Sequence, residues 1–284
     1  MTAVRRHPEW IKVRAPGGEG FAATKRVVQE LDLHTVCEEA HCPNVAECWG
    51  HRTATFMLLG DVCTRNCGYC AVGHGRPVAV DPHEPMRVAE GVARLGLKHV
   101  VVTSVDRDDL PDGGAGHFAA TAQAIKERAA SCAVEVLTPD FKGSLSALAQ
   151  VVDSPIDVFN HNTETVPRLY RRARPGGQYA RALALLREAK RRRSTLPTKT
   201  GLMLGLGEER EELLEVFRDL AAVGCDILTL GQYLQPTRAH LPVERYVPPA
   251  EFQELRAVAL ETGFRHVEAG PLVRSSYHAW EHVA

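Results

Sequence analysis

The feature that most constrains the fold of this chain is a regular alternation of strand-like and helix-like segments after residue 53. Apolar runs typical of buried strands recur at 54–59, 98–104, 133–138, 156–160, 199–205 and 226–231. Helical patterns lie between and after them, at 86–96, 116–130, 144–152, 178–193, 209–223 and 249–262. Strands separated by helices indicate βαβ units and a parallel sheet.

This alternation places the chain in the α/β class. Six such units are fewer than the eight of a complete barrel, so an open or partial (βα)6 parallel barrel is predicted at 53–268. The segment 264–268 can add a further short strand. Residues 1–52 show little periodicity and are predicted to form an N-terminal extension laid on the barrel, and 269–284 form a C-terminal tail.

Composition excludes several classes of protein. Hydrophobic residues make up 44% of the 284 residues and charged residues 24%, which is incompatible with a disordered chain or a coiled-coil rod. The net charge of −1 argues against nucleic-acid binding driven by charge. No apolar run approaches the ~20 residues that span a bilayer, and the first residues lack the apolar core of a signal peptide. A cytoplasmic protein without a membrane partner is therefore expected.

The eight cysteines are unevenly distributed, because six of them lie between residues 37 and 70. These six form two trios, Cys37, Cys42, Cys48 and Cys63, Cys67, Cys70. Clustered thiols in a reducing compartment are more often metal ligands than disulfides. A structural zinc ion needs four ligands, and His41 or His74 could supply the fourth, so zinc stays an alternative. The two remaining cysteines, Cys132 and Cys225, have apolar surroundings and are predicted to be small core residues.

Three thiolates suit a cubane iron–sulfur cluster that keeps one iron open for a cofactor, a substrate or an unusual protein ligand. On a helix, Cys42 would lie about 140° from Cys37, and Pro43 disfavours helix before it, so the first trio is predicted to be irregular chain. The second trio follows the apolar run 55–59. It is therefore expected in a loop at the carboxyl end of the first strand, where the active sites of α/β barrels lie.

The motif Cys63-x₃-Cys67-x₂-Cys70 after a first strand is similar to the signature of radical S-adenosylmethionine (SAM) enzymes. Combined with Cys37-x₄-Cys42-x₅-Cys48 and with Arg274-Ser-Ser-Tyr277, it resembles the lipoyl synthase family over nearly the whole chain. Four further stretches share this resemblance, at 8–14, 103–110, 160–165 and 231–236.

The resemblance implies a sulfurtransferase reaction on an octanoyl chain that is held in amide linkage on a lysine of a carrier domain. Sulfur enters at C6 and C8, whose unactivated C–H bonds require radical chemistry from a cofactor. The cluster on the second trio would bind SAM and cleave it to methionine and a 5′-deoxyadenosyl radical, which removes a hydrogen from the octanoyl chain. The carbon radical would then attack a sulfide of an auxiliary [4Fe–4S] cluster on the first trio. Two rounds use two SAM molecules and consume that cluster.

The resemblance also implies a fourth ligand for the auxiliary cluster. The serine is assigned to Ser276, with Ser275 as the second choice, and the alternative interpretation of both is a helix cap or a turn. Such a ligand would tie the tail to the extension across the barrel mouth. Seven further residues are candidates to bind SAM by the same resemblance: Gly113, Gly114, Asn160, Asn162, Gly201, Gly205 and Glu208. Their alternative role is in turns and strand ends whose polar groups are satisfied locally.

The implied partners are octanoylated lipoyl carrier domains or the glycine cleavage H protein, a flavodoxin or ferredoxin as electron donor, and a carrier for cluster assembly. The basic runs 190–193 and 171–172 are expected to be solvated helix faces, with docking of an acidic carrier as the second interpretation. His161 and His278 are expected to be structural. Rival functions are another radical SAM enzyme with an auxiliary cluster, a non-catalytic iron–sulfur carrier, and a zinc-stabilised interaction module.

Overall fold

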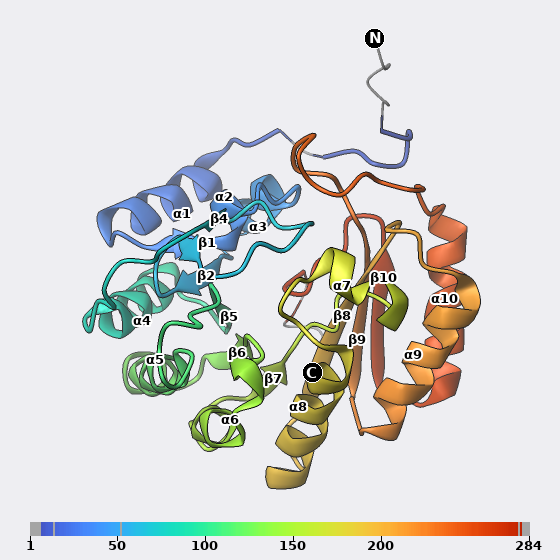
Figure 1. Ribbon diagram of the computed structural model, residues 1–284. Helices are drawn as coiled ribbons and strands as arrows, with labels where there is room; N and C mark the ends of the chain where they lie inside the picture. Colours follow the sequence, from blue (N-terminus) through green and yellow to red (C-terminus); the bar gives the residue numbers. More distant parts are fainter. Residues whose placement is uncertain (1–6, 14, 52, 278, 280–284) are drawn as a thin grey trace.

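A computed structural model of the chain describes residues 7–13, 15–51, 53–277 and 279 (Figure 1). The strands are β1 His34–Thr35, β2 Thr55–Leu58, β3 Val62–Cys63, β4 Gly73–His74, β5 His99–Ser104, β6 Ala133–Leu137, β7 Val158–Asn160, β8 Thr198–Leu204, β9 Ile227–Gln232 and β10 His266–Gly270. The helices are α1 Glu19–Glu30, α2 Val36–Glu39, α3 Val45–Gly50, α4 Glu84–Leu95, α5 Ala115–Arg128, α6 Leu145–Val152, α7 Tyr170–Ala173, α8 Tyr179–Arg192, α9 Arg210–Ala222 and α10 Pro249–Thr262.

The main sheet is an open, mostly parallel partial barrel. Within the described residues it has eight strands in the order β1-β2-β5-β6-β7-β8-β9-β10, and only the β1–β2 pair is antiparallel. Helices α4, α5, α6, α8, α9 and α10 follow one another around the outside of the strands in Figure 1. The predicted α/β partial barrel is confirmed, since each of the six strand-like runs contains a strand and β10 adds a seventh parallel one.

The central strands are almost fully buried because both of their faces are covered, and the polar side chains that they carry are buried too. Every residue of β2 and of β9 is buried, as expected for parallel strands that are flanked by helices outside and by packed side chains inside.

Local signals set the helix ends. Gly96 ends α4 in a left-handed conformation at φ 65°, and Ser144 caps α6 by accepting from the Ala147 N–H at 3.3 Å.

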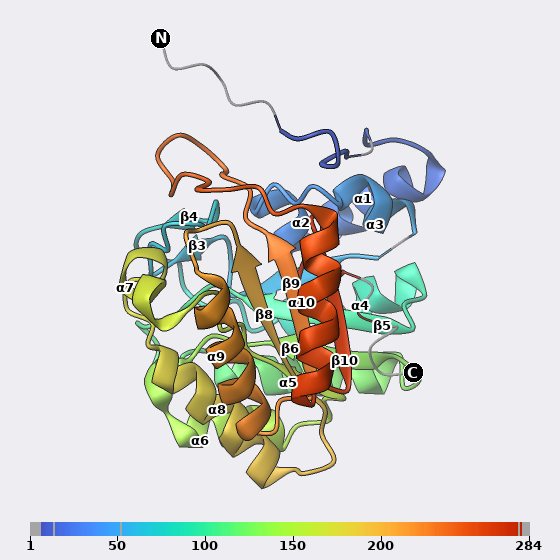
Figure 2. The ribbon, with the colours of Figure 1, turned by 90° about the vertical axis from the view of Figure 1, so that its right-hand side faces the viewer.

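The extension contains more regular structure than its sequence suggested. Residues 1–52 were expected to lack periodicity, yet α1 has an amphipathic face with Thr24, Val27 and Val28 buried. The missed signal is the i, i+3, i+4 spacing of these residues. The extension also supplies β1, which pairs with β2. Figure 2 shows α1, α2 and α3 above the strands, at the end toward which β8 and β9 point.

The first trio departs from the predicted irregular chain in two places. Cys37 lies in α2 and Cys48 lies in α3, and only Cys42 is in irregular chain. Thr35 starts α2 by accepting from the Glu38 N–H at 3.3 Å, and α3 buries Ala46 and Trp49. Capping and core burial therefore favour short helices on both sides of the bend at Pro43.

An ion pair lies inside the barrel. The Lys199 Nζ atom is 2.8 Å from Glu135 Oε1, and both side chains have no exposed surface. Asn160 donates from Nδ2 to the same carboxylate at 2.8 Å. Burial alone would raise the pKa of Glu135, but Lys199 and His99 outweigh it and lower the pKa to about 2.

Removal of one charge of this pair should destabilise the fold strongly. Glu135→Gln is expected to lower the free energy of unfolding by about 3–5 kcal/mol, because it leaves a buried ammonium without its counter-charge. The double variant Glu135→Gln/Lys199→Met should recover most of this loss. Urea unfolding under anaerobic conditions measures both. Arg191→Ala, which breaks the exposed Arg191–Glu188 pair, is the control and should leave the midpoint unchanged. A Glu135→Gln variant as stable as the parent would contradict the expectation.

Candidate active site

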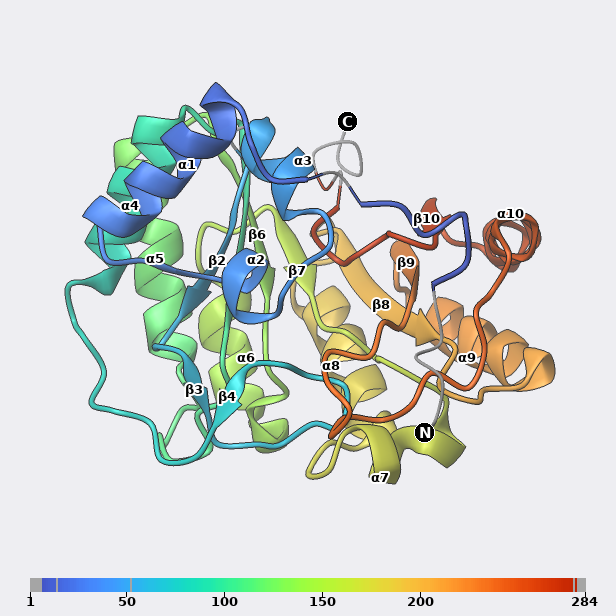
Figure 3. The same cartoon turned by 90° about the horizontal axis from the view of Figure 1, so that it is seen from above.

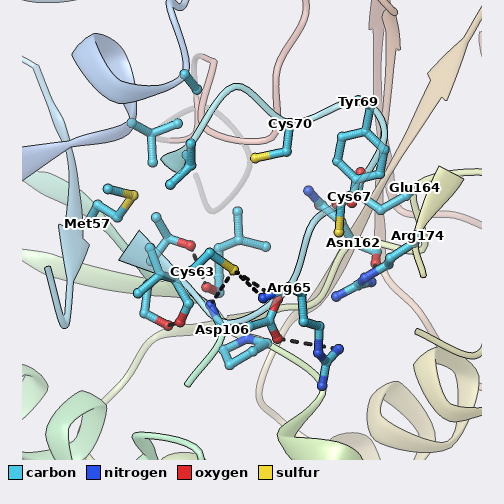
Figure 4. A pocket seen from close by; sticks show the side chains of 18 of the residues that line it. Met57, Cys63, Arg65, Cys67, Tyr69, Cys70, Asp106, Asn162, Glu164 and Arg174 are labelled. Atoms are coloured by element: carbon cyan, nitrogen blue, oxygen red, sulfur yellow. Dashed lines mark hydrogen bonds and ion pairs between the residues drawn. The ribbon is translucent and has the colours of Figure 1, made fainter. Parts of the chain in front are cut away.

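The second trio lies at the carboxyl end of the sheet, beside a cavity of about 220 Å³. Figure 4 shows the sulfur atoms of Cys63, Cys67 and Cys70 facing a common space. Cys63 belongs to the short strand β3, which pairs with β4, and this pairing closes the loop that carries the other two cysteines. The trio was predicted to be a loop at this end of the first strand, and β3 is an addition to that loop.

The cavity is lined from several parallel strands and from the extension. Its walls come from the ends of β5 and β6, from the chain after β7, and from α2. The lining residues outside the cysteine loop are Val36, Ala40, Met57, Thr103, Ser104, Val105, Asp106, Leu137, Thr138, Pro139, Asn162, Glu164 and Arg174. The site is thus built by the carboxyl ends of strands, with the extension as part of its wall.

The Cys63 loop is fixed by the loop that follows β5. The N–H groups of Arg65 and Asp106 both donate to the Cys63 Sγ atom, at 3.4 and 3.3 Å. The Arg65 side chain is buried between carboxylates, at 2.7 Å from Asp108 and 2.7 Å from Asp140. These charge-assisted bonds hold the cysteine loop against two neighbouring loops of the barrel.

The thiols of the second trio are neutral at ordinary pH in the protein without metal. Burial is the largest cause, and it raises the pKa of Cys67 to about 12. Burial and the nearby charge of Cys63 raise the pKa of Cys70 to about 11. Burial also raises the pKa of Cys63. Buried thiols gathered at a cavity are suited to bind a metal centre, because its positive charge stabilises the thiolates that burial disfavours.

The first trio forms a second group of thiols in the extension. Burial and then the charge of Cys42 raise the pKa of Cys37 to about 12. Burial and then the charges of Cys37 and Cys42 raise the pKa of Cys48 to about 12. These mutual effects mean that the three thiols lie near one another. In the part of the chain that the structure describes, no three His, Cys, Asp or Glu side chains converge on a single-ion site.

The C-terminal tail reaches the first trio. Asn44 donates from Nδ2 to the Leu272 carbonyl at 2.7 Å, and Tyr277 donates from its hydroxyl to Glu47 at 3.1 Å. Arg274 is near enough to lower the pKa of Cys42 in part, against the larger raising effect of burial. Figure 3 shows this part of the tail next to α3, seen from above. The tail and the extension therefore meet, as the sequence predicted.

Arg274 to Tyr277 form a turn, in which the Tyr277 N–H donates to the Arg274 carbonyl at 2.9 Å. Ser275 and Ser276 are its two central residues, and both are partly exposed. Ser275 contacts the Asn162 side chain, at 2.9 Å from Nδ2 and 3.1 Å from Oδ1. This turn agrees with the alternative interpretation, in which the two serines are part of a turn. It is also compatible with Ser276 as a ligand.

The seven candidate SAM residues fall into different environments. Asn162 lines the cavity. Gly201 faces Asn162, since a Cβ atom at Gly201 would lie 2.8 Å from the Asn162 Oδ1 atom. Asn160 is fully buried and donates to Glu135, which places it below the cavity lining.

The four other candidates form turns, and none of them is among the residues that line the cavity. Gly205 has φ 98°, and its N–H donates to Glu208 at 2.6 Å, so the Glu208 carboxylate shapes the turn after β8. Gly113 and Gly114 precede α5, and a Cβ atom at Gly114 would lie 2.3 Å from the Leu59 side chain. These contacts explain the glycines by packing, and their assignment to SAM stays a prediction.

Several cavity residues escaped the sequence analysis. Glu164 has a left-handed φ of 71°, and its carboxylate interacts with Tyr69 and Asn162 while burial raises its pKa. Arg174 is 6% exposed and donates to the Asn162 carbonyl at 2.9 Å. Asp106 and Glu164 could have been found from the family resemblance, because they lie in the stretches 103–110 and 160–165 that share it. Arg174 gave no signal, because it lies in an ordinary basic run.

His161 is a buried histidine under this site. Its Nδ1 atom is 2.9 Å from the Thr138 carbonyl, so Nδ1 carries the proton, and Nε2 faces Arg174 at 3.5 Å. Burial and the Arg174 charge lower its pKa to about 3. These contacts give it the structural role that was predicted. His278, the other predicted structural histidine, lies outside the described residues.

The buried His161 should make stability depend on pH. His161 binds a proton near pH 6.5 in the unfolded chain and only near pH 3 in the folded chain. Its contribution to the free energy of unfolding is therefore fully present above pH 6.5 and decreases as the pH falls from 6.5 toward 3. The slope for one such group is at most about 1.4 kcal/mol per pH unit. His161→Gln is expected to lack this contribution, so the stability difference between parent and variant narrows from pH 7 to 5. Chemical unfolding across this range measures it, and parallel profiles would contradict it.

Two family models match the chain. Residues 57–220 match the radical SAM superfamily, and residues 2–42 match the N-terminal domain of lipoyl synthase of the radical SAM family. Curated relatives match over nearly the full length. The chain is 59% identical over 280 residues to lipoyl synthase from Methylococcus capsulatus, covering 98% of this chain and 87% of the relative. It is 57% identical over 278 residues to lipoyl synthase from a Roseiflexus species, covering 98% and 92%.

Solved structures share the fold. SuiB from Streptococcus suis bound to S-adenosylmethionine has a TM-score of 0.58 at 13% identity, covering 81% of this chain and 54% of that chain. Methylornithine synthase (PylB) has a TM-score of 0.52 at 14% identity, covering 89% and 84%. The chain thus spans about half of SuiB. At these identities the likeness concerns the fold alone.

Proposed function

Because this chain belongs to the lipoyl synthase family, we propose that its two cysteine trios hold the two [4Fe–4S] clusters of lipoyl synthesis. The enzyme is a sulfurtransferase that inserts two sulfur atoms, at C6 and C8, into an octanoyl chain on a lysine of a protein substrate. When bound, the clusters and SAM supply the hydrogen-abstracting radical and the sulfur, at a cost of two SAM molecules and the auxiliary cluster.

The second trio is proposed to carry the cluster that binds SAM. The observation that supports this assignment is that Cys63, Cys67 and Cys70 all line one cavity, into which residues from the strand ends also project. Thr138 is 4% exposed, lines the same cavity, and its hydroxyl has no hydrogen-bond partner among the described residues. An unpaired buried hydroxyl fits a site that is completed by a polar ligand.

The first trio is proposed to carry the auxiliary cluster, with Ser276 as the fourth ligand. The contacts of the tail with Asn44 and Glu47 support this proposal, because these two residues lie beside Cys42 and Cys48 in the sequence, and Arg274 is near enough to lower the pKa of Cys42 in part. The tail also covers part of the mouth and can limit the access of water, which protects a reactive carbon centre. Ser275 stays the second choice for this ligand, and its contact with Asn162 argues for a different role.

The SAM-binding residues remain proposals of different strength. Asn162 has the best support, since its side chain lines the cavity, and Gly201 leaves the room that its amide occupies. Gly113, Gly114, Asn160, Gly205 and Glu208 are proposed to shape the surrounding turns and strand ends. Their backbone groups remain candidates for the methionine and adenosine parts of SAM.

We propose three functional parts in the chain. Residues 1–52 carry the auxiliary ligands, residues 53–268 form the catalytic partial barrel, and residues 269–284 form the covering tail. The proposed protein substrates are lipoyl carrier domains or the glycine cleavage H protein. The proposed electron donor is a flavodoxin or ferredoxin, and a cluster-assembly carrier renews the auxiliary cluster. No helix among the described residues is both long enough and apolar enough to cross a bilayer. A cytoplasmic location stays a prediction.

An anaerobic assay tests the function as a whole. The purified protein, an octanoylated lysine peptide, SAM and a strong reductant should give lipoyl peptide, methionine and 5′-deoxyadenosine. Iron and sulfide analysis should find about eight irons per chain, four for each cubane. Zinc in place of iron, or SAM cleavage without any sulfur transfer, would contradict the proposal.

The two trios should fail differently when they are substituted. Cys63→Ala, Cys67→Ala and Cys70→Ala should each abolish the formation of 5′-deoxyadenosine. Cys37→Ala, Cys42→Ala and Cys48→Ala should still cleave SAM but form no lipoyl product. Cys225→Ala, which alters a buried cysteine far from both trios in sequence, is the control and should keep both activities. The division of roles is wrong if a variant of the first trio, properly folded, has lost SAM cleavage.

Ser276 should matter mainly for the transfer of the second sulfur. A serine oxygen is a harder ligand than a thiolate, and its bond to iron is suited to break when the cluster is attacked. Ser276→Ala is expected to leave SAM binding near normal and to reduce the product with two sulfur atoms sharply, with the singly thiolated peptide accumulating. Mass spectrometry of the peptide separates these products. Full activity of Ser276→Ala would remove this residue from the ligand set.

A further inference from the structure

We propose that Ser275 is a positioning residue that couples closure of the C-terminal tail to binding of SAM, through its contact with Asn162. This inference rests on the proposed function, because it takes the cavity beside the second trio as the SAM site. It assigns different tasks to the two neighbouring serines of the tail: Ser276 serves the auxiliary cluster, and Ser275 serves the SAM site.

The contact between Ser275 and Asn162 has two points. The Asn162 Nδ2 group donates to the Ser275 hydroxyl oxygen at 2.9 Å, and that hydroxyl lies 3.1 Å from Asn162 Oδ1, to which it donates. A hydroxyl can both donate and accept, so this one group meets both ends of the amide and restrains the plane in which the amide lies. The two residues are 113 positions apart in the sequence, so the contact links two separate parts of the chain.

Asn162 is in turn part of the cavity wall. Its side chain interacts with the Glu164 carboxylate, and its carbonyl accepts from Arg174 at 2.9 Å. All three residues line the cavity, and they lie close together in Figure 4. A change in the orientation of the Asn162 amide would therefore alter the polar surface that a ligand in the cavity meets.

Gly201 supports the same interpretation from the other side. A Cβ atom there would lie 2.8 Å from Asn162 Oδ1 and 2.9 Å from Thr229 Oγ1, which is closer than a real Cβ atom approaches. The strand β8 therefore has no side chain where the Asn162 amide lies, and the amide is confined between Gly201 and Ser275. The need for space thus explains this glycine without any direct contact between Gly201 and SAM.

The tail around Ser275 is held elsewhere by the extension. Leu272 on one side accepts from Asn44, and Tyr277 on the other side donates to Glu47. Ser275 lies between these contacts and turns to the barrel instead. Ser275 joins a tail that covers the auxiliary site to a residue of the SAM cavity. Closure of the tail and binding of SAM must therefore be linked thermodynamically. A ligand that stabilises the Asn162 orientation stabilises the closed tail, and the closed tail favours the ligand by the same factor.

The experiment uses anaerobic protein with both clusters and compares the parent with Ser275→Ala and Ser275→Thr. Hydrogen–deuterium exchange of peptides that cover residues 270–277 is measured with and without SAM, and the dissociation constant of SAM is measured by titration. In the parent, SAM should slow exchange of the tail. Ser275→Ala should lose this protection and bind SAM about 3- to 10-fold more weakly, the range that loss of one or two hydrogen bonds produces.

The variant Ser275→Thr keeps the hydroxyl and should bind SAM within about twofold of the parent, a smaller change than the loss of one ordinary hydrogen bond causes. It should also keep part of the SAM-dependent protection of the tail from exchange. Ser146→Ala removes an exposed hydroxyl on α6 and serves as the matched control, with no effect on either measurement. Unchanged SAM affinity together with SAM-dependent protection of the tail in Ser275→Ala would overturn the inference. Loss of iron from Ser275→Ala would overturn it too, because the serine would then act on the auxiliary cluster.

Failure of this inference differs from failure of the proposed function. If the parent protein lacks two clusters or forms no lipoyl peptide, the proposed function is wrong, whatever the behaviour of Ser275. If the parent forms lipoyl peptide and Ser275→Ala behaves like the parent in both measurements, only the inference about Ser275 is wrong.

Discussion

The arrangement of the active site depends on the buried guanidinium of Arg65. It bridges carboxylates from two loops, Asp108 after β5 and Asp140 after β6, and lies between the first two cysteines of its own loop. A buried cation surrounded by carboxylates is stable only when its partners are in place. The cysteine loop, the β5 loop and the β6 loop therefore adopt their positions together. This mutual dependence lets a loop that has only the short strands β3 and β4 as regular structure hold three thiols in defined positions.

The rest of the site is assembled from parts of the chain that are distant in sequence. The barrel supplies the cavity at the carboxyl ends of its strands, the extension adds Val36 and Ala40 to the cavity wall, and the tail joins the extension through Asn44 and Tyr277. The extension is fixed on the barrel by the buried face of α1, by Trp49 and by the pairing of β1 with β2, and the tail is held in turn by its contacts with the extension. A reaction that proceeds through carbon radicals benefits from such a cover, because it limits the access of water to the cavity.

Sequence reasoning succeeded where a repeated pattern or a fixed spacing carries the signal. Each parallel strand of the barrel overlaps one of the predicted strand-like runs, and the helices between them begin within two residues of their predicted starts. The motif Cys63-x₃-Cys67-x₂-Cys70 was located correctly at the carboxyl end of the first strand of the barrel. Both signals are local, and a local pattern is readable without knowledge of the fold.

The features that were missed depend on tertiary contacts. Short helices hold Cys37 and Cys48 because Thr35 caps one of them and Trp49 buries against the core in the other. Arg174 lines the cavity although its sequence context is an ordinary basic run. Gly201 was associated with SAM from the family resemblance, whereas its surroundings explain the glycine by the room that the Asn162 side chain needs. The Thr35 cap is a local signal that was overlooked, whereas in the other cases the side chain is determined by a neighbour that is distant in sequence.

The burial of the thiols has a further consequence for the assembly of the site. In the protein without metal, three buried thiolates close together would repel one another, and the raised pKa values of Cys37 and Cys48 keep these groups neutral instead. Each thiol that binds iron must then release a proton, so cluster insertion is coupled to proton release and is favoured as pH rises. The same burial that would keep water from radical chemistry therefore also makes cluster insertion depend on the release of these protons.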